Sequence, residues 1–177
     1  MKRERKLFRN IIIISALLYT FYYFGGYYIS KEQCITETMR SLYVKEENIV
    51  LEVQTGNHIR TLVVDDSLST LSIIGMRKAG PFYHTASCST GMNIKKDQAF
   101  SIYSVYNSDS GLTSFVYRNN KDIAYIELIL NDGSIVVLDN WHKDFAGVIV
   151  DTEEVYGIYR GYDVNGELIE ERDCSNN

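Results

Sequence analysis

The stretch IVLEVQTGNHIRTLVV, from Ile49 to Val64, decides the fold class of this 177-residue chain. Residues 49–53 and 59–64 are short runs rich in β-branched side chains, and the segment 55–57, Thr-Gly-Asn, separates them. Two such runs joined by a glycine-containing turn are typical of a β-hairpin. The sequence therefore predicts antiparallel pairing at this point of the chain.

Further short runs of the same kind follow, each bounded by turn residues: 71–76, 82–88, 100–106, 113–117, 123–130, 135–138, 145–150, 155–162 and 167–171. The polar stretch 89–98 interrupts them and is expected to be a mobile loop. About ten short strands with tight turns favour an antiparallel β-sandwich or barrel over alternating β-α units. The sequence predicts a mainly β (α+β) protein, with a β domain over residues 46–172 and a frayed tail over 173–177.

The first thirty residues differ in character from this β domain. A basic tail over residues 1–10 carries Lys2, Arg3, Arg5, Lys6 and Arg9. Residues 11–29 are uncharged, and about 20 apolar residues in a helix cross a ~30 Å hydrocarbon core. Basic residues before a first span tend to stay in the cytoplasm. This pattern predicts a single-pass signal anchor in the cell membrane, with a cytoplasmic N-terminus and an extracytoplasmic C-terminal domain.

Two alternatives to an anchor explain the segment less well. A cleaved signal peptide has a shorter apolar core and small residues at its cleavage site, whereas aromatic residues stand at this position. A buried core helix fits poorly because no side of the run is polar. Five tyrosines crowd the outer half and are expected at the headgroup level, where amphipathic rings collect: Tyr19, Tyr22, Tyr23, Tyr27 and Tyr28. Contact with a partner helix at Gly25-Gly26 is the other interpretation of this half.

A second, membrane-proximal helix is expected within residues 30–45. The stretch 30–33, Ser-Lys-Glu-Gln, fits a capping box in which Ser30 caps the helix and Gln33 reaches back. Ile35, Met39 and Leu42 recur at positions i, i+4 and i+7, which predicts an apolar stripe packed on the domain. No Gly/Ser-rich linker precedes this helix, so the β domain should lie close to the bilayer.

The charge balance limits the partners of the outer domain. The chain has 18 basic and 23 acidic side chains, and the first 30 residues hold five of the basic and one of the acidic ones. The remainder, with 13 basic and 22 acidic side chains, has a net charge of −9. This charge argues against nucleic-acid binding and against lying flat on anionic lipid. It permits cation or basic-peptide partners, although solubility alone is its commoner meaning.

Three cysteines, Cys34, Cys88 and Cys174, stand in a segment predicted to be extracytoplasmic. One disulfide and one free thiol are a possible outcome there, and Cys88–Cys174 is the pair to test. Cys34, close to the predicted membrane surface, is interpreted as a buried small hydrophobic residue. No histidine is placed beside a cysteine in the way that nucleophilic catalysis needs.

The loop 139–144, Asp-Asn-Trp-His-Lys-Asp, is the best candidate interaction surface. It groups Trp141, the only tryptophan, with His142 and the carboxylates of Asp139 and Asp144 between two strands. Functional loops often have this composition. The alternative, which we favour, is that Trp141 closes one end of the sandwich while its neighbours stay in water.

Two weaker patterns have a structural interpretation that we favour. His84 and Cys88 lie four residues apart on a predicted strand and could supply two metal ligands, but no spacing nominates the others. Asp163-Val164-Asn165-Gly166 is similar to the start of a calcium loop, but its glycine is at the fourth position instead of the sixth. We interpret it as a turn. The sequence thus indicates no catalytic residue, no metal and no cofactor.

The chain resembles a recurring type of small single-pass membrane protein from Bacillus-like Gram-positive bacteria. The likeness lies in the basic tail, the anchor and three stretches of the outer domain: 52–66, 131–135 and 160–169. These stretches contain turn and strand sequence and no known active site. The resemblance implies a membrane-tethered extracytoplasmic domain and transfers no catalytic residue.

Two functions follow as hypotheses. The first is a membrane-anchored binding or accessory protein that contacts a membrane or cell-wall protein through its β domain. The second is an extracytoplasmic hydrolase of cell-wall material, which rests only on location and a few carboxylates and histidines. A sensor with its own output domain is excluded, because about ten cytoplasmic residues cannot fold alone.

Overall fold

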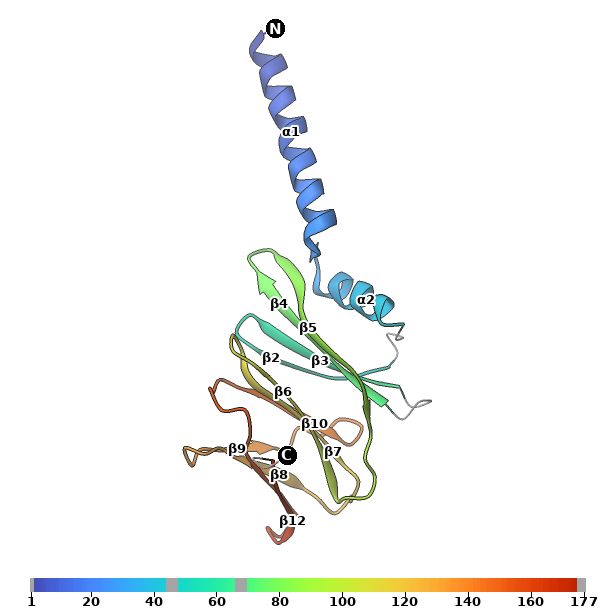
Figure 1. Cartoon of the computed structure of the whole chain (residues 1–177), viewed down its shortest axis with the longest axis vertical. Helices are drawn as coiled ribbons and strands as arrows, with labels where there is room; N and C mark the ends of the chain where they lie inside the picture. The colour runs from blue at the N-terminus through green and yellow to red at the C-terminus, as the bar shows by residue number, and fades with distance from the viewer. Residues whose placement is uncertain (1, 44–47, 66–69, 175–177) are drawn as a thin grey trace.

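The computed structural model describes residues 2–43, 48–65 and 70–174 (Figure 1). Two helices come first, α1 (Lys2–Gly25) and α2 (Lys31–Ser41). The strands in chain order are β1 (Tyr27–Tyr28), β2 (Ile49–Thr55), β3 (His58–Asp65), β4 (Thr70–Ala79), β5 (Phe82–Asn93), β6 (Phe100–Asn107), β7 (Gly111–Arg118), β8 (Tyr125–Ile129), β9 (Ile135–Leu138), β10 (Phe145–Val150), β11 (Ile158–Tyr162) and β12 (Leu168–Asp173).

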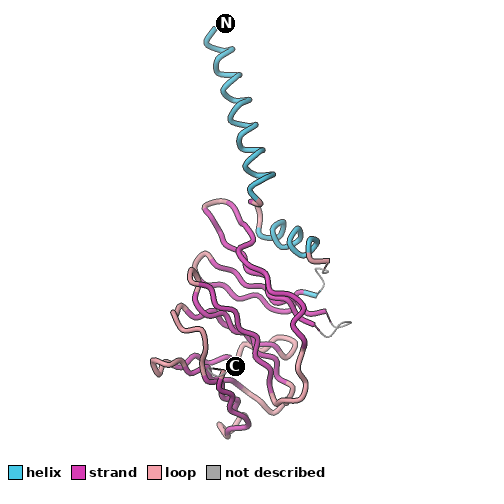
Figure 2. Tube along the Cα trace, viewed as in Figure 1, coloured by secondary structure: helices cyan, strands magenta, loops and turns pink. Residues whose placement is uncertain are grey.

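These strands form three antiparallel sheets (Figure 2). The first sheet has the order β1-β5-β4-β3-β2, the second β10-β7-β6 and the third β12-β11-β8-β9. The prediction of a mainly β, antiparallel fold is confirmed. No sheet among the described residues closes on itself, so the barrel alternative is wrong. The third sheet lies at the end of the molecule opposite α1 (Figure 1).

The predicted hairpin at residues 49–64 is formed by β2 and β3, and β2 is an edge strand of the first sheet. Thr55 pairs with His58 across a turn in which Gly56 has a φ of 52°. Six consecutive residues of β3, from Ile59 to Val64, are buried. A strand with one wet face would alternate between buried and exposed residues. Both faces of this strand are therefore covered, one by α2 and the other by the second sheet.

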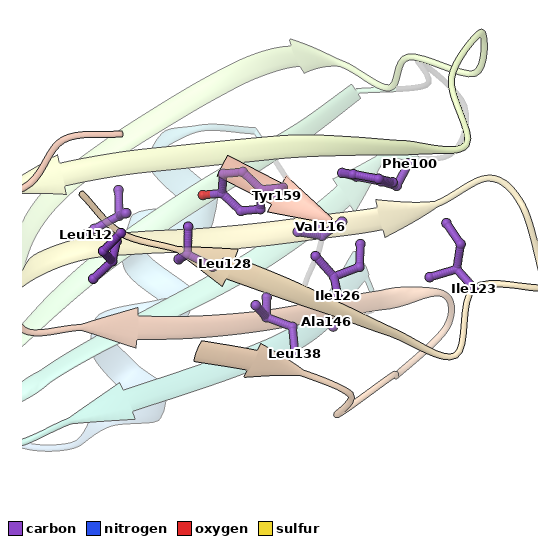
Figure 3. Packing of buried hydrophobic residues seen from close by; sticks show 10 residues of the cluster. Phe100, Leu112, Val116, Ile123, Ile126, Leu128, Leu138, Ala146 and Tyr159 are labelled. Atoms are coloured by element: carbon purple, nitrogen blue, oxygen red, sulfur yellow. The ribbon is translucent and has the colours of Figure 1, made fainter. Parts of the chain in front are cut away.

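Three clusters of buried side chains hold the layers together. The first lies between α2 and the first sheet and includes Cys34, Ile35, Met39, Ile59, Val63, Ile74 and Met76. The second lies between the first and second sheets and includes Leu62, Val64, Leu71, Ile73, Tyr103, Phe115 and Phe145. The third joins the second and third sheets and includes Phe100, Leu112, Val116, Ile123, Ile126, Leu128, Leu138 and Tyr159 (Figure 3).

The predicted membrane-proximal helix is present as α2. The Ser30 side chain accepts a hydrogen bond from the backbone N–H of Gln33 at 3.1 Å, as an N-cap does. The Gln33 side chain does not complete a capping box, because it donates to the Tyr22 hydroxyl of α1 instead. Ile35 and Met39 are buried on the first sheet with Leu42 beside them, so the predicted stripe is confirmed. Residues 44 and 45 of the predicted segment lie outside the described residues.

The N-terminal helix differs from the predicted segment 11–29 at both ends. It begins at Lys2, within the basic tail, and ends at Gly25. Gly26 has a φ of 63°, and Tyr27 and Tyr28 then pair with His84 and Tyr83 as β1. Among the described residues we find no helix that combines the length and the apolar character needed to cross a membrane.

Other boundaries also differ from the prediction, and two of them change the extent of a predicted loop or tail. Strand β5 continues to Asn93, so the expected mobile loop 89–98 is wrong over its first half. Strand β12 includes Asp173, so the predicted tail starts too early, and residues 175–177 lie outside the described residues. Pairing with β4 explains the longer β5, because Thr70 and Leu71 extend that ladder to Asn93 and Met92.

Arg60 is an unexpected member of the core between the first and second sheets. Its side chain is fully buried (0% exposed), and no carboxylate of the described residues pairs with it. Its Nη2 donates to Ser110 Oγ at 2.9 Å and its Nε to Thr113 Oγ1 at 3.3 Å, while Nη1 has no hydrogen-bond partner in the described part of the chain. Burial lowers the pKa of this guanidinium.

Candidate functional site

The candidate loop 139–144 ends in a tight hairpin between β9 and β10. The His142 N–H donates to the Phe145 carbonyl at 2.7 Å, and the Phe145 N–H donates to the His142 carbonyl at 2.9 Å. Between them, Lys143 and Asp144 have φ values of 48° and 68°. Positive φ at both central residues defines a type I′ turn, which Asn-Gly normally occupies. The turn is therefore strained at Lys143, since aspartate tolerates this conformation and lysine rarely adopts it.

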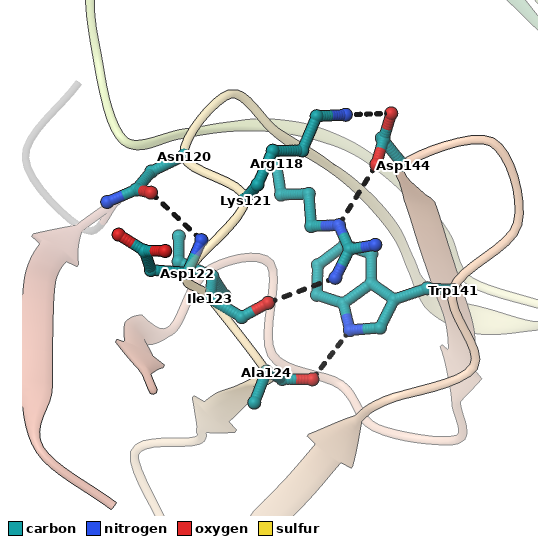
Figure 4. Close-up of polar contacts among 8 residues, drawn as sticks. All are labelled: Arg118, Asn120, Lys121, Asp122, Ile123, Ala124, Trp141 and Asp144. Atoms are coloured by element: carbon teal, nitrogen blue, oxygen red, sulfur yellow. Dashed lines mark hydrogen bonds and ion pairs between the residues drawn. The ribbon is translucent and has the colours of Figure 1, made fainter. Parts of the chain in front are cut away.

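Trp141 is half-buried and packs against the third core cluster. Its indole N–H donates to the Ala124 carbonyl at 2.7 Å, and the Arg118 guanidinium lies 4.7 Å from the ring centroid (Figure 4). A guanidinium over an indole face at this distance is a cation–π contact. These contacts hold the ring in place and agree with the interpretation that Trp141 closes one end of the layers.

Asp144 and Trp141 belong to one cluster because Arg118 contacts both of them. Its Oδ1 accepts from Arg118 Nε at 3.1 Å, and its Oδ2 forms an ion pair with Lys121 (Figure 4). Arg118 also donates to the Ile123 carbonyl at 3.1 Å. The hydrogen bond from Lys121 is the largest cause that lowers the pKa of the Asp144 carboxyl, and Arg118 acts in the same direction.

The other two candidate residues do not enter this cluster. The side chains of Asp139 and His142 are exposed, and the backbone carbonyl of Asp139 accepts from the Trp141 N–H at 2.9 Å. The neighbouring Asn140 side chain instead exchanges two hydrogen bonds with the Gly147 backbone, at 3.0 and 3.3 Å. The structure thus brings Trp141 and Asp144 together and leaves Asp139 and His142 in solvent.

Arg118 and Lys121 are central to this site, and sequence reasoning missed both. Arg118 ends β7, and Lys121 lies in the following loop, more than twenty positions before Asp144. They meet Asp144 because β7 pairs with β10, which places Tyr117 opposite Phe145. No local motif signals this contact, since it depends entirely on the strand pairing.

An open cavity of about 500 Å³ lies beside the cluster. Its lining includes Arg118, Lys121, Asp122, Asp163 and the exposed Val164. Two carboxylates in one cavity would suit acid–base catalysis only with a suitable pKa. Hydrogen bonding to the backbone of Glu167 lowers the pKa of Asp163, which makes this carboxyl a poor general acid near neutral pH. The cavity therefore offers mixed charge for contacts, with Asp163 favoured as a carboxylate.

The stretch 163–166 is a turn, as the sequence predicted. The Asp163 Oδ1 accepts from the backbone N–H groups of Asn165 and Glu167, both at 2.8 Å. Gly166 has a φ of 81° and closes the hairpin between β11 and β12. The carboxylate is thereby used for an Asx-turn.

A β-bulge separates His84 from Cys88. Arg77 pairs with His84, but Ile74, three residues earlier on β4, pairs with Cys88. Residues three apart on a strand face opposite sides, and paired residues share a side. His84 and Cys88 therefore face opposite sides of the first sheet, and the metal-ligand pairing considered for them fails on geometry. No group of three or more His, Cys, Asp or Glu side chains able to hold a metal occurs in the described ranges.

The three cysteines are free thiols in three different environments. Cys34 is a residue of α2 buried against the first sheet, Cys88 is exposed on β5, and Cys174 is partly buried after β12. Burial raises the pKa of each thiol. Cys88 in the first sheet and Cys174 beyond the third are not paired.

Comparison with protein-family models, with curated proteins and with solved structures gave no match to this chain.

Proposed function

We propose that this protein is a membrane-anchored binding or accessory protein whose β domain works outside the cytoplasm through protein–protein contacts at the cell surface. The observation that carries the proposal is the apolar surface of α1, which extends away from the sheets (Figure 1). Its large apolar side chains are between 49% and 67% exposed: Leu7, Phe8, Ile11, Ile12, Ile13, Ile14, Leu17, Leu18 and Tyr19.

The distribution of these side chains supports burial on all sides. Ile11 to Ile14 are consecutive, and four consecutive helical residues point around a full turn. An amphipathic helix resting on a surface would keep one polar side instead. Exposing such a contiguous apolar surface to water is unfavourable, so lipid or a partner helix is its natural environment.

The apolar part of α1 is short for a membrane span. From Ile11 to Gly25 it would extend about 22 Å, against ~30 Å for a hydrocarbon core. Local thinning of the bilayer and extension of basic side chains toward the headgroups accommodate such a mismatch. Arg5, Lys6 and Arg9 precede the apolar part and favour a cytoplasmic N-terminus. In this orientation the third sheet is far from the membrane.

The proposed location has a direct test that uses Cys88, the exposed thiol of the β domain. A membrane-impermeant maleimide applied to intact cells should label Cys88 in the full-length protein. The matched control is an Arg5→Cys variant in which Cys88 and Cys174 are both replaced by serine, and it should be labelled only after lysis. Labelling of Cys88 only after lysis, with Arg5→Cys behaving identically, would place the β domain in the cytoplasm and refute the proposal.

The proposed contact surface is the exposed part of the loop 139–144 with the adjoining cavity. A photo-crosslinking amino acid at His142 should form a specific adduct with a protein in native membranes, whereas one at Tyr43, which is 97% exposed beside α2, should not. Replacing residues 2–25 with an unrelated anchor should leave the His142 adduct unchanged. Adducts at both positions, or at neither, would count against this surface.

A further inference from the structure

A separate cavity of about 170 Å³ lies between the second and third sheets, lined by Lys95, Gln98, Ile102, Ser104, Val155, Tyr156, Tyr159, Arg172 and Cys174. It draws residues from β6, β11 and β12 and from the segments that precede β6 and β11. At about 30 Å³ per water molecule, this volume corresponds to about five or six waters. The cavity is therefore large enough for a small organic molecule and too small for a peptide.

The charged lining of this cavity is entirely positive. Lys95 and Arg172 line it, and no carboxylate is among the described residues that do so. This is unusual in a domain whose net charge outside the first 30 residues is −9. Arg172 and the neighbouring Asp173 both act electrostatically on the Cys174 thiol of the lining, and Arg172 has the larger effect. An anionic group is the matching ligand chemistry for the two cations of the lining.

A ring of three hydroxyl groups adjoins the cavity, and two of its members, Ser104 and Tyr159, belong to the lining. Tyr159 Oη is 3.0 Å from Ser104 Oγ and 2.8 Å from Ser114 Oγ, and the two serine oxygens are 3.2 Å apart. Tyr159 is 1% exposed, and its oxygen is drawn in Figure 3. Each hydroxyl has one donor and two lone pairs, so a closed ring of three uses every donor and leaves acceptors. The ring therefore favours a ligand group that donates a hydrogen bond.

Apolar side chains complete the lining. Ile102 lies on β6, and the Cys174 side chain packs against the third core cluster. Val155 and Tyr156, 40% and 46% exposed, stand on the segment that precedes β11. A short carbon skeleton suits these apolar side chains better than a second charge does.

From these features we propose that the cavity binds a small carboxylate that also carries a hydroxyl group, such as a short 2-hydroxy acid. The carboxylate lies by Arg172 and Lys95, and the hydroxyl donates its one proton to the oxygen of Ser104 or of Tyr159. This site goes beyond the proposed cell-surface contacts and does not depend on them, because it involves neither α1 nor the loop 139–144.

The test uses Cys174 as a reporter inside the cavity. The full-length protein in mild detergent is treated with a thiol reagent, and modification of each cysteine is followed by mass spectrometry. Lactate at about 10 mM should slow modification of Cys174 several-fold, since a ligand of so few atoms binds weakly. Modification of the exposed Cys88 should not change, which makes it an internal control.

Two analogues separate the parts of the proposal. Lactamide lacks the negative charge and propionate lacks the hydroxyl. For each, a roughly tenfold higher concentration should be needed to give the same protection of Cys174. Inorganic phosphate tests whether any anion suffices. Equal protection by lactamide, or by phosphate and lactate alike, would overturn the proposed ligand class, as would unchanged Cys174 reactivity with lactate.

Matched variants test the two cations. Arg172→Gln and Lys95→Gln should each lose most of the protection by lactate. Arg160→Gln, on the neighbouring strand, and Lys96→Gln, next in sequence, should keep it. If Arg172→Gln fails to fold, the pair at Lys95 and Lys96 still decides the question. Protection retained in Lys95→Gln and in every other folded variant would refute the role of the cations.

Discussion

A methyl group at Gly75 should destabilise the protein strongly, because Arg60 fills the space that the methyl would take. A Cβ atom at this position would lie 1.8 Å from Arg60 Nη1 and 2.4 Å from Ser87 Oγ. Non-bonded heavy atoms do not approach so closely, so one of them must move. Arg60 cannot swing into water, since it is 0% exposed and holds Ser110 and Thr113.

The expected loss of stability follows from the interactions that moving Arg60 would break. Overpacking a core costs typically 1–3 kcal/mol. Hydrogen bonds made by a charged group contribute about 1.5–3 kcal/mol each, and Arg60 makes two that would be lengthened or lost. An alanine in a strand recovers up to about 1 kcal/mol relative to glycine. We therefore expect Gly75→Ala to lower the free energy of unfolding by about 3 kcal/mol, or the Tm by about 6–12 °C.

Urea unfolding followed by the fluorescence of Trp141, the single tryptophan, measures this free energy. Arg60→Met supplies the second half of a double-mutant cycle, because a flexible uncharged side chain can yield to the new methyl. The double variant should regain at least about 1 kcal/mol over additivity. Gly161→Ala is the control, since its Cβ would be 3.1 Å from Phe100, a gentler contact. A cost below about 1 kcal/mol, or one unaffected by Arg60→Met, would refute the reasoning.

Three further predictions concern the strained hairpin and its cluster. Lys143→Asn should raise the free energy of unfolding by about 1 kcal/mol in thermal melts, because asparagine tolerates a positive φ better than lysine; an unchanged or lower value would contradict the strain. Since the pKa of the Asp144 carboxyl is lowered in the folded protein, its contribution is present above its unfolded pKa, near 4, and is lost as the pH falls below it. Asp144→Asn should therefore flatten the stability profile in urea titrations below pH 5, and an unchanged slope would refute this. Trp141→Phe should lower the free energy of unfolding, measured by circular dichroism, by about 2 kcal/mol, because the hydrogen bond to Ala124 and the contact with Arg118 are both lost. An unchanged free energy of unfolding would show that the indole ring is dispensable.

The strands were predictable because their signals are local. Alternation and turn residues located the hairpin at residues 49–64 and most of the later strands to within a few positions. The predicted strand boundaries fail where pairing with a strand distant in sequence determines the structure. Strand β5 extends through a polar stretch because β4 offers it a partner, and Tyr27-Tyr28 becomes a strand because the edge of β5 is free to pair. Neither partner is visible in the local sequence.

The sequence singled out the loop 139–144 as a candidate surface and missed the side chains that this loop contacts. The composition of the loop drew attention to Trp141, and the structure packs that ring against the third core cluster. Arg118 and Lys121 were not predicted as part of the site, because no local sequence pattern indicates that they pair with the distant Asp144. Arg60 is a clearer case, since a charged residue in an alternating strand is expected in solvent. Its burial follows from the second sheet that covers β3, which no pattern within residues 58–65 reveals.

The pairing of Tyr27 and Tyr28 with β5 has a mechanical consequence for the proposed anchor. A membrane helix followed by a flexible linker would leave the β domain free to rotate. Here the chain passes from α1 through Gly26 directly into a strand, and Gln33 of α2 donates to Tyr22 of α1. Two connections at the base of the helix oppose its bending relative to the first sheet. A partner that tilts α1 in the membrane would therefore move the whole stack of sheets, including the third sheet at the far end.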